Sequence, residues 1–129
     1  QIQMVIDAGG MGPLIAHLGA EHAADIRREA CWAVSNAAVG ATQEQALHIA
    51  ATNIVQHLRE FLGPDYRIVH EVTLEALEKL FKVDEQGGVG VVAQAKECGL
   101  AAHLALAASE DPECDEACNM LLEQLEGDE

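Results

Sequence analysis

Aromatic side chains are scarce in this sequence. Only 3% of its 129 residues are Phe, Trp or Tyr, although half of the residues are hydrophobic. The apolar content is mostly Ala, Val, Leu and Ile, and such small aliphatic side chains suit helix-on-helix packing better than a thick sheet sandwich. Because the length fits one domain, we expect a single all-α domain.

Basic residues are also scarce. Seven Lys and Arg stand against 22 Asp and Glu, which gives a formal net charge of −15. Nucleic acids and anionic membranes require a positive footprint on the protein, so this balance argues against both as partners. A basic partner fits the charge much better. No Lys or Arg follows Lys96, and we expect residues 123–129 to be a solvated acidic end.

Paired cysteine motifs are absent. Cys31, Cys98, Cys114 and Cys118 form no CxxC pair, and no further Cys or His lies near the last two, so we predict neither a metal site nor another cofactor. Small buried thiols in a reducing compartment are the better interpretation. No apolar run approaches the roughly 20 residues that span a bilayer, and no signal-peptide pattern opens the sequence. It begins with Gln1, so we expect a piece of a longer protein.

An internal repeat organises the chain. GGMGPLIAHL from Gly9, NIVQHLREFL from Asn53 and GLAAHLALAA from Gly99 align, at offsets of 44 and 46 residues. A period of this size is typical of HEAT and armadillo arrays, whose repeats are about 40–47 residues long. The sequence therefore predicts an α-solenoid of about three repeats.

Each repeat is expected to contain three helices, of which the second is the longest. The long helices are predicted at 25–38, 66–83 and 112–126. Hydrophobic spacing places Ile26 and Ile68 on the buried stripes of the first two, with His70 and Glu71 outside. The predicted divisions are 1–9 for the third helix of a truncated repeat, 10–52 and 53–98 for two repeats, 99–126 for a last partial repeat, and 127–129 for an acidic tail.

Trp32 is the only tryptophan, and its position raises the question of whether it is buried. Its equivalents in the later repeats are Glu75 and Asn119, which are polar. A position that carries Glu and Asn in sister repeats is not a core position, so we expect the Trp32 ring to face solvent or a groove. The alternative is that it packs locally over a neighbour, because tryptophan is usually well buried.

An exposed Trp32 would share one helix face with Glu29 and Asn36, which lie three residues before it and four after it. An indole face attracts a lysine or arginine by about 0.5–2 kcal/mol and packs along its methylenes. An Asn carboxamide can bond both the N–H and the C=O of an extended backbone. Glu29 supplies the counter-charge. Together these groups predict a pocket for a basic residue of an extended peptide.

The sequence resembles the armadillo repeats of the importin-α (karyopherin-α) family, which binds nuclear localisation signals. IDAGGMGPLI (6–15), REACWAVSNAAVG (28–40), TLEALEKLFK (73–82) and KECGLAAHLALAASEDPE (96–113) carry the likeness, and the second contains the family's Trp-x-x-x-Asn signature. The likeness extends to about residue 126 and fits the last three repeats. It implies a right-handed superhelix whose long helices line a concave groove.

The resemblance also implies site residues. Trp32, Asn36 and Glu29 would belong to the minor localisation-signal site, and Glu75 stands where the next repeat would have its Trp. Lys79 occupies the Asn position of that repeat and is expected to repel a cationic ligand. A single pocket then predicts weak peptide binding.

By the same resemblance, the protein is a nuclear import adaptor that moves between cytoplasm and nucleus. Its partners would be the basic nuclear localisation peptides of cargo proteins, importin-β through a segment N-terminal to this sequence, and an export receptor at residues 99–126. No nucleic acid and no membrane are expected.

Two other function classes remain for comparison. An armadillo or HEAT scaffold could bind another basic protein outside nuclear transport, and it would not need Asn36 to hold a peptide backbone. An enzyme has little support, because the serines and histidines show no nucleophile–base spacing and the glycine clusters GGMG and GGVG lack a preceding strand and a Lys-Ser/Thr. We therefore predict no catalytic residues.

Overall fold

The computed structural model describes residues 15–19, 22–88 and 90–127, and every regular element in these ranges is helical. No helix among them is both long enough and apolar enough to cross a bilayer. The elements are α3 (Ala24–Val39), α4 (Gln43–Ala50), α5 (Ile54–Leu58), η1 (Arg59–Leu62), η2 (Pro64–Val69), α6 (His70–Gly87), α7 (Val91–Glu97), α8 (Leu100–Glu110), η3 (Pro112–Cys114) and α9 (Asp115–Gly127).

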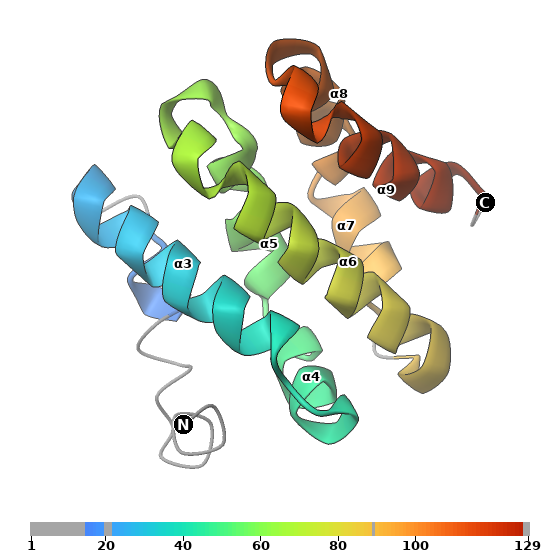
Figure 1. The fold of residues 1–129 in the computed structure, drawn as a ribbon. Helices are drawn as coiled ribbons and strands as arrows, with labels where there is room; N and C mark the ends of the chain where they lie inside the picture. Colours follow the sequence, from blue (N-terminus) through green and yellow to red (C-terminus); the bar gives the residue numbers. More distant parts are fainter. Residues whose placement is uncertain (1–14, 20–21, 89, 128–129) are drawn as a thin grey trace.

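The three long helices form one layer of the molecule. Figure 1 shows α3, α6 and α9 side by side, with the shorter helices behind them. Contacts join α3 to α6 and α6 to α9 in that layer, and α4, α5 and α8 pack from behind. This arrangement confirms the predicted all-α solenoid. The helix predicted for residues 1–8 lies outside the described residues.

A continuous hydrophobic core fills the space between the two layers. Its largest fully buried side chains include Leu58, Phe61, Leu77, Phe81 and Leu104, which come from four different elements. Burial of a side chain of this size stabilises a fold by about 1.5–3 kcal/mol. The core therefore joins neighbouring helices into one body, as a solenoid requires.

Helix ends follow local sequence signals. Thr42 and Gln45 form a capping box at the start of α4, in which each side chain bonds the backbone N–H of the other. Gly88 ends α6 in the left-handed conformation, with φ of 61°, which a residue without Cβ adopts readily. Gly88 belongs to the glycine cluster GGVG, which therefore ends a helix here.

Three of the predicted burial assignments are wrong. Ile68 is 77% exposed and His70 only 2% exposed, the reverse of the prediction. The helical pattern does not continue back from α6, because Tyr66 has non-helical φ and ψ of −118° and 27° and the turn around it is a 3-10 helix. Ile26 is 44% exposed, while the neighbouring Arg27 side chain turns inward and is 11% exposed.

Candidate peptide-binding site

The exposed face of α3 carries the two residues that the sequence singled out. Trp32 is 50% exposed, and Asn36 lies exposed one turn later on the same face. The opposite face of α3 is buried and built from small residues, including Ala30, Cys31 and Val34. The Trp32 indole is on the exposed face and therefore lies outside the core. The prediction that Trp32 faces solvent or a groove is confirmed.

A cavity of about 250 Å³ lies where α3 meets the start of α6. Trp32 and Asn36 line it from α3, and Glu71 and Glu75 line it from α6. Ile68 and Val72 supply apolar surface. We call this cavity the Trp32 pocket. It combines an aromatic face, a carboxamide and two carboxylates, the groups that a lysine or arginine side chain on an extended peptide would use.

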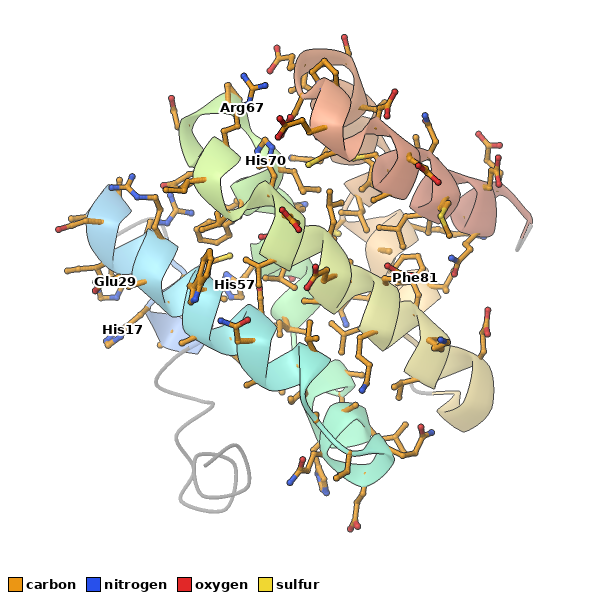
Figure 2. The ribbon with its side chains drawn as sticks, in the orientation of Figure 1. His17, Glu29, His57, Arg67, His70 and Phe81 are labelled. Carbon is orange, nitrogen blue, oxygen red and sulfur yellow. The ribbon has the colours of Figure 1, made fainter. Side chains whose placement is uncertain are left out.

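The structure brings together three of the four predicted site residues. Trp32, Asn36 and Glu75 all line the Trp32 pocket, whereas Glu29 is exposed on α3 without lining it. Figure 2 labels Glu29 on α3. Glu29 can still attract a cationic ligand through the field of the groove, but the carboxylates nearest to the indole come from α6.

The sequence analysis missed three residues of the Trp32 pocket, which are Ile68, Glu71 and Val72. Glu71 lies one turn before Glu75 on α6, so the i, i+4 spacing of the two acids was a usable signal. Ile68 was assigned to the core from its apolar character. Its exposure follows from the break in the helix at Tyr66, which hydrophobic spacing alone does not reveal.

The Lys79 ammonium group forms hydrogen bonds to two backbone carbonyls. Its Nζ donates to the carbonyl of Ala41 at 2.9 Å and to that of Val39 at 3.4 Å, at the carboxyl end of α3. A helix carries partial negative charge at this end, so the ammonium has a favourable place there. Lys79 does not line the Trp32 pocket. Its predicted repulsion of a cationic ligand therefore acts from the end of α3 rather than from within the pocket.

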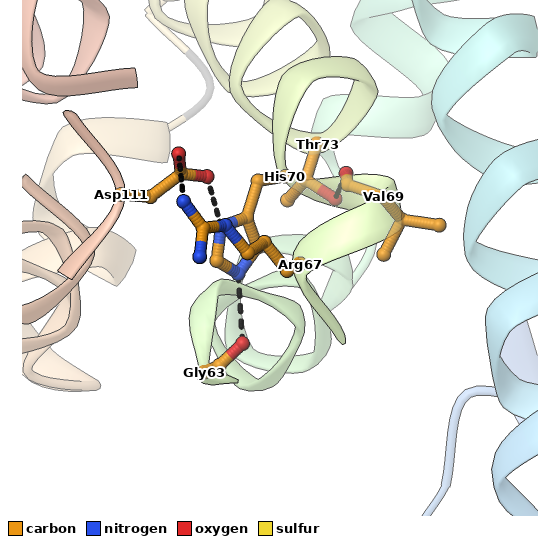
Figure 3. Close-up of polar contacts among 6 residues, drawn as sticks. All are labelled: Gly63, Arg67, Val69, His70, Thr73 and Asp111. Carbon is orange, nitrogen blue, oxygen red and sulfur yellow. Dashed lines mark hydrogen bonds and ion pairs between the residues drawn. The ribbon is translucent and has the colours of Figure 1, made fainter. Parts of the chain in front are cut away.

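A buried polar cluster fixes α6 against the turn before α9. His70 Nδ1 lies 2.9 Å from Asp111 Oδ2, and His70 Nε2 lies 2.7 Å from the carbonyl oxygen of Gly63 (Figure 3). Arg67 donates to the other Asp111 oxygen at 3.3 Å. Figure 2 shows Arg67 and His70 at the same end of the molecule. Since Ile68 lies between them in sequence, this cluster sets the position of a residue that lines the pocket.

The same cluster brings together three side chains of types that can bind a metal ion. Ligand atoms of His70, Asp111 and Cys114 lie within 4.8 Å of one another. Both His70 nitrogens and both Asp111 oxygens already have hydrogen-bond partners, however. Burial, followed by its hydrogen bond to Asp111, raises the pKa of the Cys114 thiol to about 12. A protonated thiol is a poor metal ligand and a poor nucleophile. We therefore interpret the cluster as a structural contact that holds α6 in place.

A second cluster anchors the beginning of α3. Arg27 Nε donates to the carbonyl of Leu18 at 3.0 Å, and its terminal nitrogens donate to the Tyr66 hydroxyl at 2.8 Å and to Glu60 at 2.9 Å. The guanidinium also lies over the Phe61 and Tyr66 rings, within 5.3 Å of their centroids. This cluster fixes the N-terminal end of the helix that carries Trp32.

Comparison with known families agrees with this architecture. Residues 1–39 match the family model of the Armadillo/beta-catenin-like repeat. The match supports an armadillo-repeat protein. It covers the helix with Trp32 and Asn36 but stops before α6 and α9. A comparison with curated proteins found no match. Because armadillo repeats generally mediate protein–protein binding, the chain is best described as a protein-interaction solenoid.

Proposed function

We propose that this chain binds an extended basic segment of a protein partner, with one lysine or arginine side chain in the Trp32 pocket. The observation that carries this proposal is the half-exposed indole of Trp32 beside Asn36 and opposite the carboxylates of Glu71 and Glu75. The methylenes of the basic side chain pack on the indole, and its charge is neutralised by the carboxylates. Asn36 bonds the peptide backbone.

The net charge of −15 supports this partner class. A strongly acidic surface raises the rate at which a basic segment encounters it, and the effect weakens as salt screens the charges. One cation–π contact and two backbone hydrogen bonds sum to a few kcal/mol before the cost of association is subtracted, so we expect a single pocket to bind no more tightly than about millimolar. We therefore expect this chain alone to be a weak binder.

Within this proposal, the resemblance to importin-α gives the biological role. The basic segments would be nuclear localisation signals of cargo proteins, and the protein would act as an import adaptor in cytoplasm and nucleus. The same resemblance gives importin-β as a partner through a segment N-terminal to this sequence, and an export receptor at residues 99–126. The alternative is a scaffold that binds another basic protein. It would have the same fold and charge, but it would not need Asn36 to bind the backbone of its partner.

Intrinsic fluorescence tests the proposal, because Trp32 is the only tryptophan. A lysine-rich localisation peptide is titrated into the protein at low salt, where electrostatic attraction is strongest. We expect a saturating change in Trp32 emission, and Asn36→Ala should weaken binding about 30-fold by removing two backbone hydrogen bonds worth about 1 kcal/mol each. Asn119→Ala is the matched control, since Asn119 is exposed on α9 and does not line the Trp32 pocket.

Two outcomes would contradict the proposal. Emission that stays constant up to millimolar peptide would show that the Trp32 pocket takes no basic peptide. Equal binding by wild type, Asn36→Ala and Asn119→Ala would favour the alternative scaffold, in which the Asn36 carboxamide does not bind the peptide backbone. A peptide of the same length in which glutamate replaces each lysine is the control. It checks that any change in Trp32 emission requires the positive charges of the peptide.

A further inference from the structure

A second cavity lies on the other side of α6. Its volume is about 510 Å³, twice that of the Trp32 pocket, and it separates α6 from the segment formed by η3 and the first turn of α9. We call it the α6–α9 groove. Its walls include Leu74 and Glu78 from α6, Glu113 from η3 and Ala117 from α9.

The α6–α9 groove adjoins the Trp32 pocket and shares three lining residues with it. Ile68, Glu71 and Glu75 line both cavities. They belong to the part of the chain that crosses the middle of the long-helix layer, between α3 and α9 (Figure 1). The two cavities are therefore neighbours on opposite sides of the same three side chains.

Carboxylates dominate the groove. Glu71, Glu75 and Glu78 follow one another at spacings of four and three residues, so they share one face of α6. Glu113 stands on the opposite wall and is exposed. None of these four side chains has a hydrogen-bond or ion-pair partner among the described residues. The one basic side chain of the lining, Arg67, is bonded to Asp111.

The groove also offers apolar surface between the acids. Ile68 is 77% exposed at the junction of the two cavities, an unusual exposure for a large aliphatic side chain. Leu74 and Ala117 contribute apolar surface farther in. An apolar floor with carboxylates at the rim matches a lysine or arginine, whose methylene stem packs on apolar surface while its charge reaches the acids.

We propose that the α6–α9 groove binds a second lysine or arginine side chain of the same extended peptide, three residues from the one in the Trp32 pocket. This inference rests on the proposed function and specifies its ligand further. The two cavities flank a single helix, and packed helices lie about 8–10 Å apart. In a polyproline II conformation residues i and i+3 point the same way and are about 9 Å apart. In a β-strand the nearest residues on one side are only about 7 Å apart.

Three peptides of equal length test this spacing. The first has lysines at i and i+3, the second has lysines at i and i+1, and the third has one lysine with glutamine at i+3. Binding is measured by fluorescence anisotropy of labelled peptide, so that both cavities are reported. The groove variant is Glu78→Gln with Glu113→Gln, because neither residue lines the Trp32 pocket. The charge control is Glu85→Gln with Glu97→Gln, two exposed acids on other surfaces.

We expect the i, i+3 peptide to bind tightest to the wild type and about fivefold more weakly to the groove variant, from the loss of two exposed ion pairs. The single-lysine peptide should bind both proteins equally. If the groove variant matches the charge control, or the i, i+1 peptide binds as tightly as the i, i+3 peptide, the groove assignment is overturned. In that case, if Asn36→Ala still binds the peptides more weakly than the wild type, the proposed function stands without the groove assignment. If Asn36→Ala changes nothing for any peptide, the proposed function fails and the groove assignment fails with it.

Discussion

His70 and Asp111 join two distant segments of the chain through one buried hydrogen bond of 2.9 Å between Nδ1 and Oδ2. The two residues are 41 positions apart, and both side chains are at most 5% exposed. His70 begins α6, and Asp111 precedes η3. Because α6 forms a wall of both cavities, this bond fixes the relative position of the surfaces proposed to hold the peptide.

Removing the imidazole should destabilise the fold. His70→Ala deletes the bonds to Asp111 and Gly63 and leaves a buried carboxylate with one partner fewer, so we expect a loss of about 2–3 kcal/mol in the free energy of unfolding. Urea denaturation followed by circular dichroism measures it. His48→Ala is the control, because His48 is exposed on α4. Equal midpoints for the two variants would show that the bond adds no stability.

Acid should remove the contribution of Asp111. The hydrogen bond from His70 is the main cause that holds the pKa of the Asp111 carboxyl below its usual 3.8. A carboxyl whose pKa is lower in the folded state adds stability above its unfolded pKa, and this stability is lost as pH falls through the folded pKa. We expect wild type to melt above Asp111→Asn at pH 6, with the difference shrinking below about pH 3.8.

Thermal melts from pH 6 to pH 2 check this dependence. Asp115→Asn is the control, since Asp115 is exposed in the first turn of α9 and should follow the wild type throughout. A constant difference between wild type and Asp111→Asn across the acid range would contradict the linkage.

Thiol labelling should distinguish Cys98 from the other three cysteines. All four are free, but Cys98 alone is half-buried while Cys31, Cys114 and Cys118 are buried. Burial is the largest cause that raises the pKa of each of the three buried thiols, so the reactive thiolate is rare at pH 8. We expect one fast equivalent of label on the native protein and four in urea. Fast labelling that survives Cys98→Ser would contradict this prediction.

Arg27 should tolerate replacement by lysine poorly. A lysine cannot reproduce a planar donor that bonds Leu18, Tyr66 and Glu60 at once while lying over two rings. We expect Arg27→Lys to lower the free energy of unfolding by about 1–3 kcal/mol, measured by urea denaturation. The neighbouring Arg28→Lys is the matched control and should stay within about 0.5 kcal/mol of the wild type. A similar loss in both variants would mean that the guanidinium geometry is unimportant.

The sequence predicted the all-α solenoid, its three long helices and the exposure of Trp32, because each depends on local spacing or on comparison between the aligned segments. Glu75 and Asn119 at the equivalent positions were enough to place the indole outside the core. Ile68 and His70 were assigned wrongly because their orientation depends on a tertiary bond. His70 turns inward to reach Asp111, and the 3-10 turn before it leaves Ile68 outside. Hydrophobic spacing contains no information about a partner 41 residues away.

Lys79 should matter for the end of α3 more than for peptide affinity. Lys79→Met keeps most of the side-chain volume but removes the donor to the carbonyls of Val39 and Ala41, so we expect a loss of about 1 kcal/mol in the free energy of unfolding. Peptide affinity should rise less than twofold, because the ammonium lies at the end of α3 and not in the Trp32 pocket.

Lys82→Met is the control that separates the effect of losing a positive charge from the effect of losing the Lys79 hydrogen bonds. Lys82 is exposed on the same helix and has no hydrogen-bond or ion-pair partner among the described residues. The Lys82→Met substitution should therefore leave the free energy of unfolding unchanged while it removes one positive charge, as Lys79→Met does. Urea denaturation and the peptide titration are run on both variants. A tenfold gain in affinity for Lys79→Met over Lys82→Met would show that Lys79 does oppose the cationic ligand, and that the ammonium leaves the carbonyls of α3 when the peptide arrives.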